Sequence, residues 1–347
     1  MNHGKIFRWW AISVIVSLLM AAGCIEPSKE TTKPQVEPEK KAQADKQLPK
    51  KAEAGSITMA LKFSPQESTN YRVRTEAQDG VKFEGSMPDK TDLKDKKNLS
   101  QTEVVFTQQI QSVNNNGNAV ANITIKGLKY LLIYKNDTVI DFDSAKDQTS
   151  PLTKLIGQSY SIEIAPTGEV VRVIDVNQAK AAVADLSSVG KAASAVLDAE
   201  EIKQRHGMVI LPAAEKKVLS LGQSWNNLKV FSFRMMGSKS YEKIYTINGV
   251  SVVNNRQVAV VDMNAIPSSE TGEKEQSAAT ITKMFDSTGT YSGRLMLDTT
   301  NGKVENYSEK LQNEWVIVDP SAKETDGNEP STLKMQSVRV YSIEKIN

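Results

Sequence analysis

Short runs of alternating apolar and polar residues recur along most of this chain, and they limit what it can fold into. In Ile57, Met59, Leu61 and Phe63 every second position is apolar, which is typical of a strand buried on one face. The same spacing occurs at 104–110, 119–125, 160–164, 231–235 and 291–297. Asn-Gly pairs at 116–117, 248–249 and 301–302 are hairpin-turn signals. Short strands joined by tight turns predict an antiparallel sheet rather than βαβ units.

One segment, residues 176–207, departs from this pattern. It is rich in alanine and has apolar residues at near-helical spacing. Asp198 and Glu201 form a plausible capping box for a second short helix, and Gly190 and Gly207 are predicted breaks. We expect the apolar stripe to pack on the sheet, with a ligand-facing lid as the alternative. The predicted fold class is therefore α+β and mostly antiparallel β: a curved sheet or half-barrel-like halves with an Ala-rich helical connector.

The folded region is predicted to span residues 56–347. Polar stretches at 85–100, 267–277 and 319–331 are predicted surface loops. A weak internal similarity suggests two related halves, 56–175 and 208–347, joined by the helical segment 176–207. Val113-Asn114-Asn115 resembles Val253-Asn254-Asn255, and Gly157-Gln-Ser-Tyr160 resembles Gly222-Gln-Ser-Trp225 out of register with the first match. Shared turn chemistry without duplication remains the alternative.

The first 24 residues have the order of an export signal. Lys5 and Arg8 precede an apolar run at 9–20, and the small residues Ala21-Ala22-Gly23 precede Cys24, the only cysteine. This segment resembles the lipobox of bacterial lipoproteins, with Ala21 where leucine is usual. The resemblance implies cleavage between Gly23 and Cys24 and acylation of Cys24, leaving residues 1–23 as a signal peptide. An uncleaved anchor or an ordinary signal peptide is the alternative.

Residues 24–55 then read as a lipidated cysteine followed by a disordered linker, because prolines and mixed charges dominate and large apolar residues are almost absent. The implied location is the cell envelope, with the protein lipid-anchored. Ile25, rather than aspartate, follows the cysteine. By resemblance to enteric sorting, this favours the outer membrane facing the periplasm, if the organism is diderm.

The remaining chain offers a second, less specific resemblance. Leu211-Pro212, Val218 and Gly222-Gln-Ser-Trp225, with the strands around them, resemble a family of uncharacterised antiparallel-β envelope lipoproteins with no assigned activity. On architecture alone, the chain is also similar to periplasmic lipoprotein carriers, in which a curved sheet holds acyl chains against a helical lid. Neither resemblance implies a catalytic residue.

Charge and residue usage narrow the function classes. The chain has 43 basic and 41 acidic residues, and the loss of Lys5 and Arg8 leaves 41 of each. This balance argues against nucleic acid as a partner, since nucleic acid requires a basic face. His206 would be the only histidine after cleavage, and we expect it to be a solvated residue at a helix end. Zinc sites need several Cys or His ligands, and one cysteine and one remaining histidine cannot supply them.

The carboxylates do not identify a site either. Asp141, Asp143 and Asp147 lack the spacing of a calcium loop, and 326–329 reads as a turn. We therefore predict no catalytic residue, no metal and no cofactor. The predicted role is a membrane-anchored envelope lipoprotein with a non-enzymatic binding or structural function, which holds an apolar ligand or an envelope protein partner. The alternative is a hydrolase of cell-wall or glycan substrates that uses two carboxylates.

Overall fold

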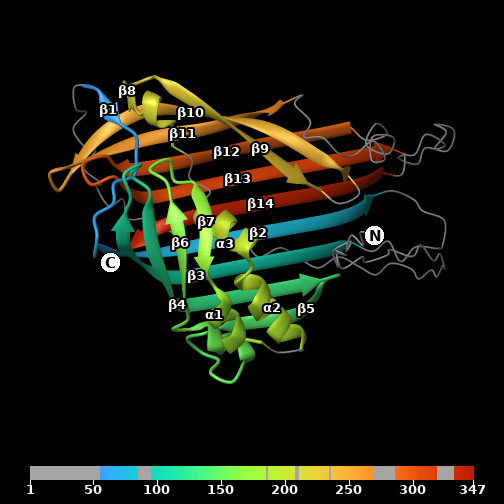
Figure 1. Cartoon of the computed structure of the whole chain (residues 1–347). Coiled ribbons are helices and arrows are strands. Elements are labelled where there is room, and N and C mark those ends of the chain that lie inside the picture. Colours follow the sequence, from blue (N-terminus) through green and yellow to red (C-terminus); the bar gives the residue numbers. More distant parts are fainter. Residues whose placement is uncertain are drawn as a thin grey trace, which may run out of the picture.

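The computed structural model describes residues 55–84, 95–184, 187–207, 211–233, 236–268, 286–318 and 332–347. These residues form a 12-stranded antiparallel sheet, a separate pair of short strands and three helices (Figure 1). The predicted signal peptide, residues 1–23, and all but the last residue of the predicted linker, residues 24–55, lie outside the described residues. The predicted loop at 319–331 and most of the one at 267–277 lie outside them too.

The large sheet is built from two antiparallel meanders. The first contains β2 (Ser68–Glu84), β3 (Lys96–Val113), β4 (Ala119–Tyr134), β5 (Asp137–Asp143), β6 (Ser159–Ile164) and β7 (Val170–Asp175). The second contains β9 (Ser224–Ser232), β10 (Ser238–Val253), β11 (Arg256–Ser268), β12 (Asp286–Asp298), β13 (Lys303–Val318) and β14 (Thr332–Ile346). The strand order is β7-β6-β4-β3-β2-β14-β13-β12-β11-β10-β9, with β5 also paired to β4. The first and last long strands, β2 and β14, thus join the meanders in the middle.

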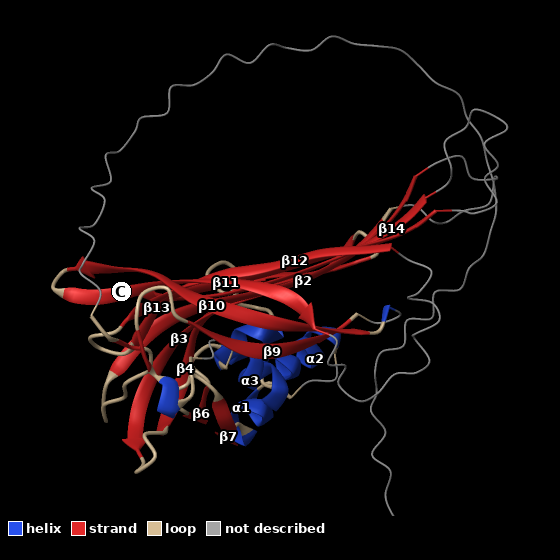
Figure 2. Ribbon diagram, turned by 90° about the horizontal axis from the view of Figure 1, so that it is seen from above, coloured by secondary structure: helices blue, strands red, loops and turns tan. Residues whose placement is uncertain are grey.

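The sheet is curved and does not close, and its concave face is covered by helices. Figure 2 shows α1 (Asn177–Ala182), α2 (Ser188–Val196) and α3 (Ala199–His206) lying within the concavity. The buried side chains between these helices and the inner face form one continuous core. The α+β class, mostly antiparallel β with a helical connector, is therefore confirmed.

The curl of the second meander brings distant strands together. Lys243 on β10 lies 2.6 Å from the carboxylate of Glu309 on β13, although β11 and β12 separate these strands in the sheet. Gly293 on β12 is the cross-strand partner of Glu309, and a Cβ atom there would come within 2.6 Å of the Ser308 carbonyl and 3.1 Å of the Glu309 Cβ. Since no side chain fills this position, β10 and β13 can approach across the concave face.

The helical segment begins and ends nearly where its caps predict. The Asp198 carboxylate accepts a hydrogen bond of 2.9 Å from the Glu200 amide at the start of α3, and Gly207 ends that helix. The Glu201 half of the predicted capping box is not formed, because the Asp198 amide donates to the Ala195 carbonyl at 3.0 Å. The prediction that Gly190 is a break was wrong, because it lies inside α2. Its amide donates to the Ser187 hydroxyl, which caps that helix.

Three of the turn, strand and loop predictions need correction. Asn248-Gly249 is not a hairpin turn; it lies inside β10 at a bulge, and the reversal comes at Asn254 and Asn255, both with positive φ. Only Ile57–Thr58 of the predicted first strand is a strand, β1, which pairs with β8 (Val218–Leu219). Lys96–Ser100, predicted as part of a loop, opens β3. The turns at 116–117 and 301–302 are confirmed.

The two Gly-Gln-Ser-aromatic segments have the same local structure. Gly157 and Gly222 both have positive φ, and each amide donates to an isoleucine carbonyl at 2.8 Å, that of Ile125 and that of Ile247 respectively. Each serine then contacts a threonine hydroxyl at 2.8 Å on the neighbouring strand. However, one segment opens β6, which follows its partner β4, and the other opens β9, which precedes its partner β10. This likeness is therefore local, and duplication of the halves stays a prediction.

Candidate functional site

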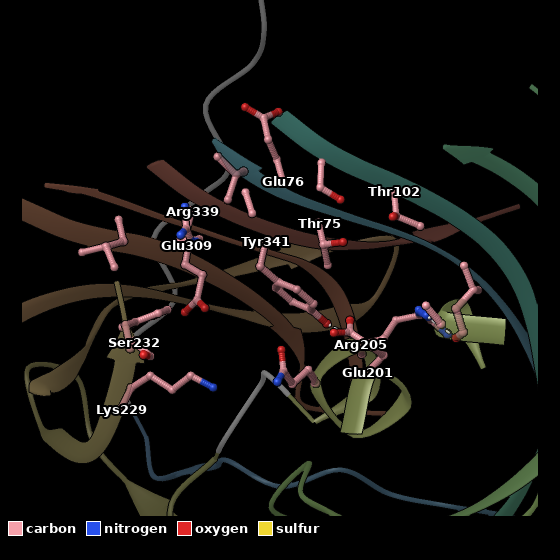
Figure 3. A pocket seen from close by; sticks show the side chains of 18 of the residues that line it. Thr75, Glu76, Thr102, Glu201, Arg205, Lys229, Ser232, Glu309, Arg339 and Tyr341 are labelled. Atoms are coloured by element: carbon pink, nitrogen blue, oxygen red, sulfur yellow. Dashed lines mark hydrogen bonds between the residues drawn. The ribbon is translucent and has the colours of Figure 1, made fainter. Parts of the chain in front are cut away.

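A cavity of about 470 Å³ lies between the concave face of the sheet and helices α2 and α3 (Figure 3). Its floor consists of two adjacent rows of inward side chains that run across the strands. In the first row, Glu309, Tyr341, Thr75, Thr102 and Tyr130 are successive cross-strand partners from β13 to β4. The second row, two residues further along each strand, contains Tyr291, Leu311, Arg339, Ala77 and Ser100.

Small side chains in the middle of these rows leave the space open. The cross-strand pairs Thr75–Thr102 and Ala77–Ser100 occupy the inner face of β2 and β3. Earlier inward positions on β2, Tyr71 and Val73, are large and buried. Because alternate residues of a strand share one face, the change from large to small along β2 places a hollow next to the core.

The helical wall of the cavity is held in place by hydrogen bonds from the sheet. The Tyr341 hydroxyl on β14 donates to the Arg205 carbonyl at 2.8 Å, which satisfies a carbonyl in the last turn of α3. The Arg205 guanidinium donates to the Val196 carbonyl at 2.8 Å, near the end of α2, and more weakly to the Tyr160 hydroxyl at 3.3 Å. Arg205 therefore ties α2, α3 and β6 together, and it lines the cavity.

His206 does not have the environment predicted for it. Its ring packs edge-on against Phe106, with centroids 4.7 Å apart, and its Nε2 lies 2.8 Å from the Tyr160 hydroxyl. Burial, and then the positive charge of Arg205, hold the pKa of His206 well below its usual value. The ring is thus a half-buried, neutral group that packs on the core residue Phe106, rather than a solvated helix-end residue. No nucleophile–base arrangement surrounds it in the part of the chain described.

The opposite wall comes from the second meander. Lys229 and Phe231 on β9 face Tyr291 and Glu309, and burial lowers the pKa of Lys229. In Figure 3, Lys229 and Arg205 lie on opposite sides of the cavity, and the Arg205 side chain extends away from Lys229, toward the end of α2. Behind this wall, the Lys243–Glu309 ion pair is almost completely buried, with 3% of each side chain exposed.

The cavity therefore combines apolar surface with an excess of donors. Its aromatic and aliphatic lining can hold a hydrocarbon part, whereas Arg205 and Lys229 can hold acceptor groups. The Tyr291 hydroxyl, on a residue 3% exposed, has no hydrogen-bond partner among the described residues. Burial, and then the charge of Glu309, raise the Tyr291 pKa, so this hydroxyl keeps its proton. Such a lining suits an amphipathic molecule better than a purely apolar one.

The residues singled out from the sequence lie elsewhere. Gly23 and Cys24 are outside the described residues, as is the turn at 326–329. Asp143 and Asp147 accept hydrogen bonds from the backbone of the loop that follows β5, which accounts for these acids without a metal. Within the described ranges, no group of three or more His, Cys, Asp or Glu could hold a metal ion. No helix in those ranges is long and apolar enough to cross a membrane.

The similarity to solved structures is weak. A lipovitellin structure, described as concerning lipid–protein interactions, matches with a TM-score of 0.41 and 11% identity over 82% of this chain. The match covers 26% of the lipovitellin chain, so this protein spans about a quarter of its length. Neither the score nor the identity supports the transfer of a function. No curated protein sequence matches the chain.

A family model gives the one assignment. It matches residues 116–304, from the β3–β4 turn to the start of β13. This span includes Arg205, Lys229 and Tyr291 of the cavity, whereas Ala77 and Arg339 lie outside it. Because the match covers more than half of the 347 residues, the chain belongs to DUF6263, a family of unknown function.

Proposed function

We propose that this protein is a lipid-anchored lipoprotein of the bacterial cell envelope that holds an amphipathic ligand between its curved sheet and its helical cover. The observation that carries the binding role is the cavity of about 470 Å³, whose floor is kept open by the small pairs Thr75–Thr102 and Ala77–Ser100. Its size lies within the range of about 300–1,000 Å³ that is usual for small-molecule sites. The role proposed is therefore binding or carriage, not catalysis.

The carboxylates of the cavity give no specific support to a hydrolase. Glu309 is ion-paired with Lys243 at 2.6 Å, and Glu76 with Arg74 at 2.8 Å, whereas Glu201 is exposed to solvent on α3. A general acid and a general base would instead need two carboxyl groups held apart across a substrate. We therefore adopt the binding function alone.

Native mass spectrometry tests the binding function. The mature chain, residues 24–347 with Cys24→Ser, purified gently from bacterial extract, should carry a co-purifying small molecule. Ala77→Phe places a ring in the hollow and should abolish this added mass while the protein remains folded. Lys126→Phe, at an exposed position on β4, is the matched control and should retain the ligand. Equal ligand loads in both variants would contradict the assigned cavity.

The anchor is tested separately. Its support is the order of positive, apolar and small residues before the only cysteine. Cys24→Ser should move the protein out of the membrane fraction, because a chain with no acyl group loses the anchoring energy of about 0.8 kcal/mol per buried methylene. Unchanged membrane retention of this variant would refute lipidation at Cys24.

A further inference from the structure

We infer that the ligand is a single-chain amphiphile with an anionic head group, and that the Arg205 guanidinium binds this head group. The inference rests on the proposed binding function and adds the chemical class of the ligand. Such a ligand has a carboxylate or phosphate head group on one hydrocarbon chain, as a fatty acid or a lysophospholipid does.

The first support is a buried positive charge without a counter-ion. Arg205 is 5% exposed, and its two hydrogen bonds go to neutral oxygens, those of Val196 and Tyr160. No carboxylate forms an ion pair with it among the residues described. The Val196 carbonyl near the end of α2 offsets only part of a unit charge. Buried charges are ordinarily paired, so the cavity beside Arg205 is a suitable place for an external anion.

The other charges of the cavity do not supply that anion. Glu309 is engaged by Lys243, and it also accepts a hydrogen bond from the Tyr307 hydroxyl. Glu76 pairs with Arg74. Glu201 lies four residues before Arg205 on α3, and its side chain is exposed to solvent. Lys229 lies on the opposite wall, where the Glu309 carboxylate attracts it. None of these carboxylates is therefore an ion-pair partner of Arg205 within the described residues.

The Tyr291 hydroxyl is a second, uncharged group of the cavity that could bind the ligand. The Tyr291 hydroxyl lines the cavity on a residue that is 3% exposed, and it has no hydrogen-bond partner in the described chain. A buried polar group normally has a partner, and an unsatisfied one calls for an explanation. Arg205 offers only donors. The carboxylate near the Tyr291 proton is that of Glu309, which already accepts from Lys243 and Tyr307, so an acceptor oxygen from a ligand would complete the hydrogen bonding of Tyr291. Arg205 and Tyr291 therefore both call for a ligand that brings acceptor oxygens.

The remaining lining accommodates the hydrocarbon part. Ala77 and Leu311 on the floor, Val196 on α2 and Phe231 on β9 present apolar surface to the same cavity. A volume of about 470 Å³ lies in the lower half of the usual range for small ligands. We therefore assign one chain rather than the two chains of a membrane phospholipid.

Two fluorescent probes with the same hydrocarbon chain distinguish the contribution of the head group to binding from that of the chain. The mature chain with Cys24→Ser is titrated with cis-parinaric acid and with its uncharged methyl ester. We expect the acid to bind at least about tenfold more tightly, the lower end of what a hydrogen bond to a charged group contributes. Arg205→Met should reduce binding of the acid to the level of the ester. Arg205→Lys should keep most of the preference, and Arg294→Met, an exposed arginine on β12, should leave it unchanged.

Tyr291→Phe provides a second test if Arg205→Met does not fold. Removal of this hydroxyl should leave the melting temperature unchanged or higher. It should nevertheless weaken binding of the acid severalfold, without affecting binding of the ester. Displacement of the probe by palmitate or by lysophosphatidylglycerol then identifies carboxylate or phosphate as the preferred head group. If acid and ester bind the wild type equally, the head-group assignment is wrong although the binding function stands. If neither probe binds, the binding function itself fails.

Discussion

Truncation of the buried lysine on β10 should destabilise the protein far more than loss of a surface charge. Lys243 lies 2.6 Å from the Glu309 carboxylate, with 3% of each side chain exposed. Its Nζ atom is also 3.1 Å from the Tyr307 hydroxyl, and it lies near the rings of three tyrosines. Burial lowers the Lys243 pKa, but attraction to Glu309 and interaction with Tyr245 outweigh this effect, so the pKa is raised overall.

The expected loss of stability follows from two opposing contributions, the attraction between the two charges and the cost of removing them from water. At 2.6 Å and an effective dielectric constant of about 20, the attraction amounts to about 6 kcal/mol, and desolvation of the two ions costs several kcal/mol each. The intact pair is therefore close to neutral for stability. Lys243→Met removes the attraction but leaves Glu309 buried, so we expect a loss of about 3–5 kcal/mol. The double variant Lys243→Met with Glu309→Leu should recover most of that loss.

Urea denaturation followed by circular dichroism, on a chain that starts at Ser56, measures these differences as a double-mutant cycle. The exposed pair Lys203–Glu200 on α3 is the control, and its coupling energy should be about 0.5 kcal/mol or less. Suppose Lys243→Met costs less than about 1 kcal/mol while the control behaves as expected. The pair would then be solvated, and the close approach of β10 to β13 would be wrong.

Three further predictions concern the helices and the core. The pKa of His206 is lower in the folded chain than in the unfolded one, so the unfolded state binds more protons below about pH 6.5. Stability should therefore fall by up to about 1.4 kcal/mol per pH unit between pH 6.5 and 5, and His206→Gln should flatten this part of a melting-temperature profile. Asp198→Ala should cost about 1 kcal/mol in urea denaturation, whereas Asp198→Asn should cost little, because asparagine also caps helices. Leu297→Ala, at a fully buried position, should cost about 2–5 kcal/mol, but Met296→Ala on the exposed side about 0.5 or less.

The alternation of apolar residues was sufficient to predict a strand where every second residue is buried on the same face of the sheet. Ala119, Ala121, Ile123 and Ile125 alternate over four inward positions of β4, and all four are buried. The cap at Asp198 is equally local, since one side chain and an amide two residues later determine it. Such features depend on neighbouring residues, so a single sequence contains the information that places them.

The errors arose where burial or turn geometry comes from distant chain segments. Met59 and Leu61 alternate like strand residues, yet their amides bond to the carbonyls of Lys217 and Pro166 in two different segments. The Asn-Gly pair at 248–249 resembles a turn, but pairing with β11 continues through it as a bulge. Nothing in the local sequence distinguishes these cases, because the deciding partners are remote.

The cavity could not be located from the sequence for the same reason. Each of its floor rows takes one residue from each of five neighbouring strands, from β13 to β4 in one row and from β12 to β3 in the other, so their composition depends on the register of each strand pair. Arg205 was not singled out because, on a helix of charged residues, it resembles any solvated side chain. Only the docking of α3 against Tyr160 and Tyr341 turns it inward.

One signal was nevertheless present, and it explains why the ligand should be amphipathic. The inward residues of β2 change from Tyr71 and Val73 to Thr75, Ala77 and Asp79 along the strand, and β3 repeats this change in the opposite chain direction. Antiparallel pairing aligns these gradients, so the inner face passes from large and apolar to small and polar at one place in the sheet. The hollow forms at that transition, because small side chains beside a filled core leave space. A molecule bound there would meet apolar surface on one side and polar groups on the other.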